Sequence, residues 1–135
     1  MDNDFINYIR SRNLEKVKNI LENETNKNAL YYKNIGLRVA ILTNNIKMVK
    51  LIIKVNNLNI SISNVIENIF FAINCGYLDI IIFLIEYFSI DKETVNDFGY
   101  TFLKASEYYY NELIKREYSQ KELETSKKII EYFSK

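Results

Sequence analysis

The residue types that most often carry chemistry are scarce in this sequence of 135 residues. It contains no histidine, the commonest general base and metal ligand, and only one cysteine, Cys75. A thiol needs an activating neighbour or a lowered pKa to act as a nucleophile, and a zinc site needs several Cys or His ligands. Because Cys75 directly precedes Gly76, it is better explained as a small packing residue or as part of the binding face than as a nucleophile. We therefore expect no catalytic residue and no metal site.

Two other arrangements could in principle hold a cofactor or transfer a proton. The three glycines, Gly36, Gly76 and Gly99, lie too far apart to build a phosphate-binding loop. The carboxylates Glu122 and Glu124 are most simply explained as the solvated first turn of a helix. The sequence thus predicts no cofactor and a protein that is not an enzyme.

Three consecutive tyrosines, Tyr108 to Tyr110, are the most unusual local feature. On a helix, three successive side chains point in directions spread over about 200°, so they cannot all lie in a core. Exposed aromatic side chains beside charges are typical of binding hot spots. The alternative is that the triplet only fills a helix that packs on its neighbours. Tyr108 and Tyr109 are candidate partner-binding residues.

The charges are balanced overall but unevenly distributed. A net charge of +1 argues against a broad nucleic-acid footprint, which needs clustered excess Lys and Arg. Residues 1–56 carry ten Lys and Arg against five Asp and Glu, whereas residues 57–99 carry one against six. This asymmetry could orient an electrostatic contact, or it could be an ordinary solvated surface.

The sequence predicts neither export nor membrane insertion. The first residues lack the basic and apolar regions of a secretory signal. The most apolar stretch, residues 78–90, is too short to span a bilayer and contains Asp79 and Glu86. A single cysteine favours a reducing compartment. We expect a soluble, cytoplasmic protein without membrane contact.

An internal repeat of 32 residues organises the chain. Residues 14–22, 46–54 and 78–86 align without a gap, with apolar residues at the first, fourth, seventh and eighth places of each, which is one face of a helix. Shorter helices are expected before them at residues 4–11, 36–43 and 67–74, with two-residue turns between, and polar connectors of about a dozen residues should separate the pairs. Ala40 and Ala72 occupy equivalent places, where a small side chain lets paired helices approach.

Residues 72–86 resemble the core of the ankyrin repeat, which typically reads Ala-Ala-x-x-Gly-His-x-Glu-Val-Val-Lys-Leu-Leu-Leu. Residues 40–54 are similar with Asn44 in the glycine place, and residues 5–22 resemble a diverged first repeat. The Thr-Pro-Leu-His motif that opens ankyrin helices is missing. The resemblance covers about residues 4–99. It implies an all-α solenoid of about four antiparallel helix pairs.

The resemblance also sets the expected organisation. The whole chain, 1–135, would be a single ankyrin-like domain, with units at about 4–35, 36–67, 68–99 and 100–135. The last pair breaks the period, and we expect it to form a lengthened C-terminal cap with helices at roughly 100–117 and 120–134.

Ankyrin stacks generally bind proteins on the concave face, so the resemblance implies a protein–protein interaction module whose partner is unknown, with no nucleic acid bound. The alternative is a self-associating structural unit, for example a homodimer. Carried over by position, the candidate contacts on the first helices are Arg10, Ser11, Val39, Leu42, Thr43, Phe71, Asn74 and Cys75. Of these, Val39, Leu42 and Phe71 could form a small apolar patch.

The abundance of residues with AT-rich codons indicates a microbe, a parasite or a large DNA virus. In this respect the sequence is similar to ankyrin proteins of giant viruses and some intracellular bacteria, which implies the cytoplasm of a host cell.

Overall fold

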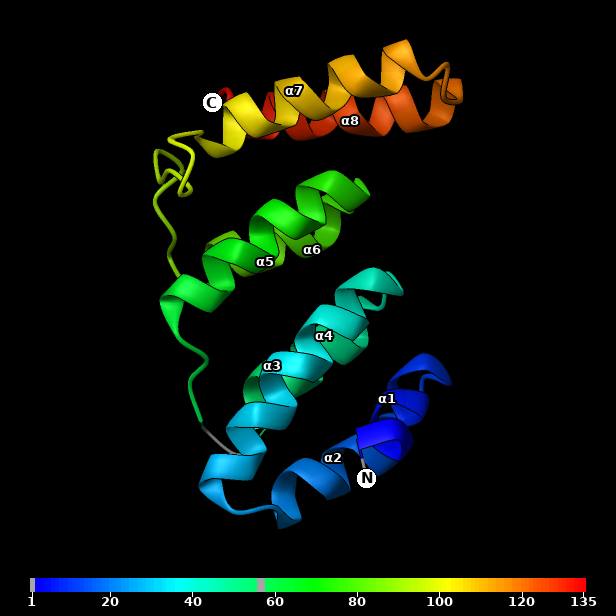
Figure 1. The fold of residues 1–135 in the computed structure, drawn as a ribbon, viewed down its shortest axis with the longest axis vertical. Helices are drawn as coiled ribbons and strands as arrows, with labels where there is room; N and C mark the ends of the chain where they lie inside the picture. Colours follow the sequence, from blue (N-terminus) through cyan, green and yellow to red (C-terminus); the bar gives the residue numbers. More distant parts are fainter. Residues whose placement is uncertain (1, 56–57) are drawn as a thin grey trace. The chain divides into compact units, whose positions relative to one another are not determined.

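A computed structural model describes residues 2–55 and 58–135 (Figure 1). Within these residues the chain forms eight α-helices and no strand, so the prediction of an all-helical protein is confirmed. The helices are α1 (Asp2–Arg10), α2 (Leu14–Asn23), α3 (Asn26–Leu42), α4 (Ile46–Lys54), α5 (Ile62–Cys75), α6 (Leu78–Tyr87), α7 (Phe102–Lys115) and α8 (Gln120–Phe133). Among the described residues, no helix has both the length and the apolar character needed to cross a membrane.

The turns inside the first three pairs share one backbone design. Arg12, Asn44 and Gly76, which lie 32 residues apart, have positive φ angles of 64°, 52° and 77°. The N–H of the following residue donates to the carbonyl five residues earlier, a pattern that ends helices at a left-handed residue. These bonds run from Asn13 to Tyr8, from Asn45 to Ala40 and from Tyr77 to Ala72. The period of 32 residues is therefore present in the backbone as well as in the sequence.

Side-chain caps fix the starts of the second helices in the first two pairs. The Asn13 side chain accepts a hydrogen bond from the Lys16 N–H, and Asn45 accepts one from the Met48 N–H, both at 3.1 Å. These bonds satisfy backbone donors that have no partner inside the helix. Because each cap directly follows a left-handed residue, the chain reverses within two residues.

Helix α3 is the main departure from the expected elements. A polar connector was predicted before residue 36, but α3 begins at Asn26, and only Glu24 and Thr25 separate it from α2. The segment contains no Gly or Pro before Gly36 that would break a helix. Its buried residues also recur at helical spacing, at Ala29, Tyr32, Lys33, Leu37, Ala40 and Ile41.

The described residues divide into two compact units, Met1–Asn68 and Ile69–Lys135, and the division falls within α5. The repeat boundaries predicted near residues 35 and 67 also lie inside helices, α3 and α5 respectively. The third predicted boundary, near residue 99, lies in the loop between α6 and α7. The assignment of the whole chain to one repeat domain stays a prediction.

The core of the first unit forms where α1 packs against α3 and α2 packs against α4. The rings of Phe5 and Tyr32 lie 4.8 Å apart between centroids. A Cβ atom at Gly36 would lie 3.1 Å from the side chains of both Phe5 and Ile9. The close approach of α1 and α3 therefore depends on the missing side chain at position 36.

A fully buried lysine ties α3 to the end of α4 in this unit. The Lys33 side chain has no exposed surface, and its Nζ donates to the carbonyls of Ile53 at 3.1 Å and Leu58 at 2.6 Å. Burial lowers the pKa of Lys33 below its usual value of 10.5. The ammonium thus satisfies two carbonyls near the C-terminus of α4, where the helix dipole also favours a cation.

We expect Lys33→Met to lower the free energy of unfolding by about 1–3 kcal/mol, because two carbonyls lose a buried donor. Denaturant unfolding measures the loss. A lowered folded-state pKa means that the unfolded chain holds the proton more tightly, so this lysine makes stability rise with pH up to about 10.5. The difference between parent and variant should therefore grow as the pH rises from neutral. An equal stability of the two proteins at every pH would contradict the assignment.

Aromatic residues build the core of the second unit. Phe102 is fully buried, and its ring lies 4.6 Å from that of Phe70 and 5.3 Å from that of Phe133. Helix α8 contacts both α7 and α6. The other fully or almost fully buried apolar residues of this unit are Ile69, Ala72, Ile73, Ile80, Ile81, Leu84, Ile85, Leu113 and Ile129.

The predicted C-terminal helix pair is present, with α7 and α8 slightly shorter than expected. Thr101 and Ser119 cap their N-termini through side-chain oxygens that accept from the N–H groups of Lys104 and Glu122. Among the apolar residues of these two helices, Leu113, Ile129 and Phe133 are buried, and Leu123 and Ile130 are half-buried. Ile114 is 49% exposed, because adjacent helix positions are about 100° apart and Leu113 takes the inner face.

Candidate functional site

Tyr109 on α7 lines a surface hollow of the second unit. A Cβ atom placed on Gly76 would lie 4.0 Å from both Cε1 and Oη of Tyr109, so the tyrosine covers the turn between α5 and α6. The positive φ of Gly76, 77°, lets the chain turn sharply there. The repeat turn and the C-terminal helix pair therefore meet at this side chain.

Two pockets adjoin Tyr109. The first has a volume of about 390 Å³ and is lined by Cys75, Gly76, Tyr77, Tyr109, Ser119, Lys121, Glu122 and Thr125. The second has about 310 Å³ and is lined by Asn74, Tyr108, Tyr109, Glu112, Leu113, Arg116 and Tyr118. We call the residues of these two pockets together the tyrosine surface. It presents four tyrosines, from the α5–α6 turn, α7 and the α7–α8 turn, in a setting of mixed charge.

The environment of Tyr109 keeps its phenol neutral. Burial of the ring raises its pKa above the usual value of 10.0, and the Glu122 carboxylate raises it further, with smaller effects from Cys75, Tyr118 and Tyr77. A neutral phenol can both donate and accept a hydrogen bond. Tyr109 is thus suited to bind a polar group of a partner.

The rim of the tyrosine surface is exposed and charged. The Tyr108 side chain is 60% exposed and that of Tyr118 is 44% exposed. Glu112 forms ion pairs with Lys115 at 3.6 Å and with Arg116 at 3.9 Å. Exposed pairs of this kind add little stability, so their side chains can exchange partners at low cost.

The structure brings together four of the candidates predicted from sequence. Asn74 is exposed and Cys75 half-buried at the end of α5, and both line pockets that Tyr109 shares. In the tyrosine triplet, Tyr108 is exposed, whereas Tyr109 and Tyr110 are half-buried. The expectation that the three could not all be core is therefore confirmed. Their role in binding stays a prediction.

The remaining candidates, apart from Phe71, gather at the corresponding end of the first unit. Arg10 and Ser11 are exposed, Val39 and Thr43 are half-buried, and Leu42 is 52% exposed. The Arg12 guanidinium donates to the Thr43 carbonyl at 3.2 Å and so links the first two repeat turns. Phe71 is half-buried and belongs to the second unit, so the predicted patch of Val39, Leu42 and Phe71 stays a prediction.

Two features were missed by the sequence analysis. Phe98 is 83% exposed in the loop between α6 and α7, although nothing in the repeat pattern marked it. The available signal was an aromatic residue directly before Gly99 in a short polar turn. Lys33 was missed because it lay in a segment expected to be a connector. Its position four residues after Ala29 and before Leu37 is the helical spacing that could have revealed it.

In the part of the chain that the structure describes, no group of three or more His, Cys, Asp or Glu residues is placed to hold a metal ion.

Comparison with known proteins adds no family to these observations: no protein-family model, no curated protein and no solved structure matches the chain.

Proposed function

We propose that this chain is a protein-interaction module of ankyrin-like helix pairs, and that the tyrosine surface contacts its partner. The observation that carries the proposal is the cluster of tyrosines around Tyr109, with mixed charges at its rim. Tyrosine and arginine are enriched in binding hot spots, whereas lysine, glutamate and aspartate are depleted in protein interfaces. The 32-residue repeat of the turns supports the ankyrin-like reading of the helix pairs.

A binding role also agrees with the chemistry of the site better than catalysis does. Tyr109 has a raised pKa, which makes its phenol a poorer general base near neutral pH. Cys75 and Glu122 line the same pocket, but without histidine the chain has no usual proton acceptor to activate a thiol. We infer a non-catalytic protein that acts in a cytoplasmic compartment, without nucleic acid or membrane lipid as its ligand.

Quantitative affinity capture from cells of the natural source tests this proposal. The baits are the parent protein, Tyr108→Ser, Tyr109→Phe and the control Tyr31→Ser, which changes a tyrosine that is 51% exposed in the first unit. We expect a partner that the parent and the control retain and that Tyr108→Ser loses by about 30-fold, the effect of one hot spot. Tyr109→Phe removes only the hydroxyl, and we expect a loss of about tenfold.

Calorimetry with each captured protein in purified form then shows whether it binds the chain directly. The proposal fails if all four baits retain the same proteins in equal amounts. It also fails if Tyr31→Ser weakens binding as much as Tyr108→Ser does, because the contact surface would then lie elsewhere.

Self-association without a separate ligand is the second candidate function. Two observations favour it. Phe98, in the loop between α6 and α7, is 83% exposed, and a groove on the first unit is lined by apolar and lysine side chains.

A further inference from the structure

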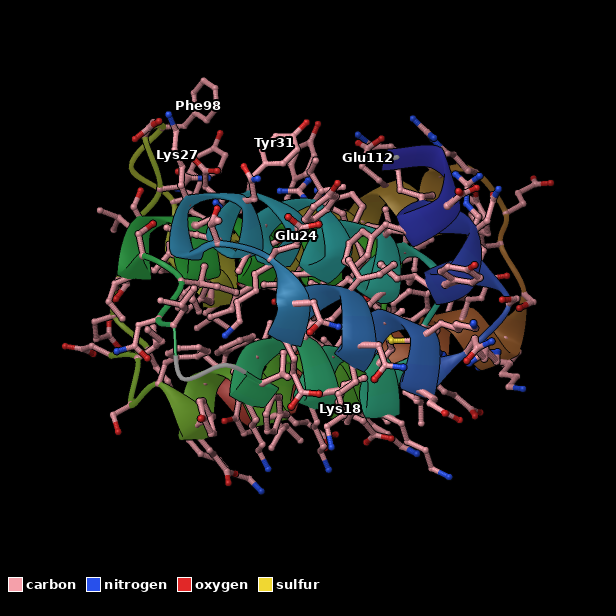
Figure 2. The ribbon with its side chains drawn as sticks, turned by 90° about the horizontal axis from the view of Figure 1, so that it is seen from below. Lys18, Glu24, Lys27, Tyr31, Phe98 and Glu112 are labelled. Atoms are coloured by element: carbon pink, nitrogen blue, oxygen red, sulfur yellow. The ribbon has the colours of Figure 1, made fainter. Side chains whose placement is uncertain are left out.

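The loop between α6 and α7 presents a large apolar side chain to solvent. We call residues 94–101 the finger. At its tip the Phe98 side chain is 83% exposed and points away from the ribbon (Figure 2), and Val95 at its base is 53% exposed. An isolated exposed aromatic residue is normal on a protein surface. This one differs because the backbone beneath it is held in place.

Hydrogen bonds centred on Asn96 brace the finger. The Asn96 side-chain oxygen accepts from the N–H groups of Phe98 at 2.9 Å and Tyr100 at 3.0 Å. The Asn96 N–H donates to the Tyr100 carbonyl, and the Gly99 N–H donates to the Asn96 carbonyl, both at 2.9 Å. Gly99 has a φ of 79°, which closes the turn. A side chain on a braced loop loses less entropy on binding than one on a loose loop.

The finger and the residues before it carry negative charge. Asp91, Glu93 and Asp97 are exposed. One nearby cation, Lys92, is engaged elsewhere, since its Nζ donates to the Tyr132 carbonyl at 3.1 Å and lies 4.0 Å from the Tyr132 ring centroid. A second, Lys104, has its Nζ 5.4 Å from the Tyr100 ring centroid. The finger therefore offers one apolar anchor among carboxylates. It fits an apolar pocket with a basic rim.

The first unit contains such a pocket. A shallow groove of about 380 Å³ runs between α2 and α4, with an apolar floor of Leu14, Leu51 and Val55. Its rim consists of Lys18, Lys47, Lys50 and Lys54, and none of the described residues that line it is acidic. Lys18 is exposed on α2. We call this the lysine groove.

We propose that the finger of one molecule docks into the lysine groove of a second copy of the same chain. The benzyl group of Phe98 would cover the apolar floor, and its neighbouring carboxylates would meet the lysine rim. Each contact joins different surfaces on the two molecules, so it leaves one finger and one groove open. Heterologous contacts of this kind extend into chains unless the geometry closes them into a ring.

The lysine groove fits the finger better than it fits a nucleic acid or an anionic membrane. Single-stranded nucleic acids are held by aromatic stacking as well as by cations, and no aromatic side chain is among the described residues that line the groove. Insertion into an anionic membrane would need several apolar side chains that project outward, but of the groove's three apolar residues Leu51 is half-buried and Val55 is buried. The finger supplies both the apolar and the acidic part of the contact.

Sedimentation of the purified protein over a range of concentrations tests the proposal. We expect the average mass to rise above the monomer's 16.1 kDa with concentration, and this rise to fade in high salt, which screens the charges at the rim. Phe98→Ser and the double variant Lys18→Glu with Lys47→Glu should each weaken association by about 30-fold. The matched controls are Tyr31→Ser and the double variant Lys27→Glu with Lys128→Glu, which should associate like the parent.

A mixture of the finger variant and the groove variant tests the pairing of these two surfaces directly. Phe98→Ser keeps an intact groove, and the Lys18→Glu, Lys47→Glu protein keeps an intact finger. At concentrations just sufficient for the parent to associate, each variant alone should stay largely monomeric, but a mixture should form a 1:1 dimer and nothing larger, because only one intact finger–groove pair can exist per complex.

Several results would overturn the proposal. They are a parent that stays monomeric at every concentration, a mixture that does not dimerise, and association that Phe98→Ser leaves unchanged. Binding of an oligonucleotide or of anionic vesicles to a monomeric parent, lost in the lysine double variant, would assign the groove to those ligands instead. Since none of these changes touches the tyrosine surface, failure here leaves the proposed partner-binding function standing, and the converse also holds.

Discussion

A chain that ends at Tyr100 should lose most of its helical signal and aggregate. The deletion removes α7 and α8, and with them the buried side chains of Phe102, Leu113, Ile129 and Phe133. Helix α8 contacts α6, so the apolar face of α6 would lose part of its cover. Stacked helical units are stabilised largely at their interfaces, and we expect a loss of several kcal/mol from a total of roughly 5–15.

Circular dichroism and size-exclusion chromatography measure this outcome. A chain that lacks only Ser134 and Lys135, both exposed, is the control and should behave like the parent. If the chain ending at Tyr100 stayed monomeric and melted at the parent's temperature, α7 and α8 would not act as a cap. The Tyr108 to Tyr110 segment would then be better explained as an independent partner-binding arm.

The second helix of each pair could be predicted almost to the residue. Helices were expected at 14–22, 46–54 and 78–86, and the structure has them at Leu14–Asn23, Ile46–Lys54 and Leu78–Tyr87. These segments combine a strong apolar period with a defined start, given by a turn residue at positive φ, which is Asn44 or Gly76 in the second and third pairs and Arg12 in the first. Where the turn residue and the apolar pattern agree, the sequence alone is sufficient to predict the bounds of a helix.

The first helices were harder to predict because their ends depend on tertiary contacts. Helix α3 begins at Asn26 and includes Lys33, whose buried Nζ donates hydrogen bonds to the carbonyls of Ile53 and Leu58. These carbonyls lie 20 and 25 residues further along the chain. A polar residue in a polar segment gives no sign of such partners, so the segment resembled a connector.

The candidate site was predicted only in part for the same reason. The sequence singled out Asn74, Cys75, Tyr108 and Tyr109, but it did not place them together, because the last helix pair breaks the repeat period. The meeting of Tyr109 with Gly76 follows from how α7 packs in the second unit. Phe98 lies outside any periodic pattern, and its exposure follows from hydrogen bonds centred on Asn96.

Phe102→Ala should be the most destabilising single substitution in the second unit. The ring is fully buried between Phe70 and Phe133, with centroids 4.6 and 5.3 Å away. Truncation of a buried phenylalanine removes apolar contact area and leaves a cavity, at a cost of about 3–5 kcal/mol. For a protein of this size, that is a large fraction of the total stability.

Phe98→Ala provides the matched control, since it makes the same chemical change on a side chain that is 83% exposed. At concentrations low enough to keep the protein monomeric, its free energy of unfolding should stay within about 0.5 kcal/mol of the parent's. Urea unfolding of both variants, followed by circular dichroism, gives the comparison. If Phe102→Ala cost no more than Phe98→Ala, the aromatic cluster would not hold α5, α7 and α8 together. Helices α7 and α8 would then have to be held by other contacts, such as those between α6 and α8.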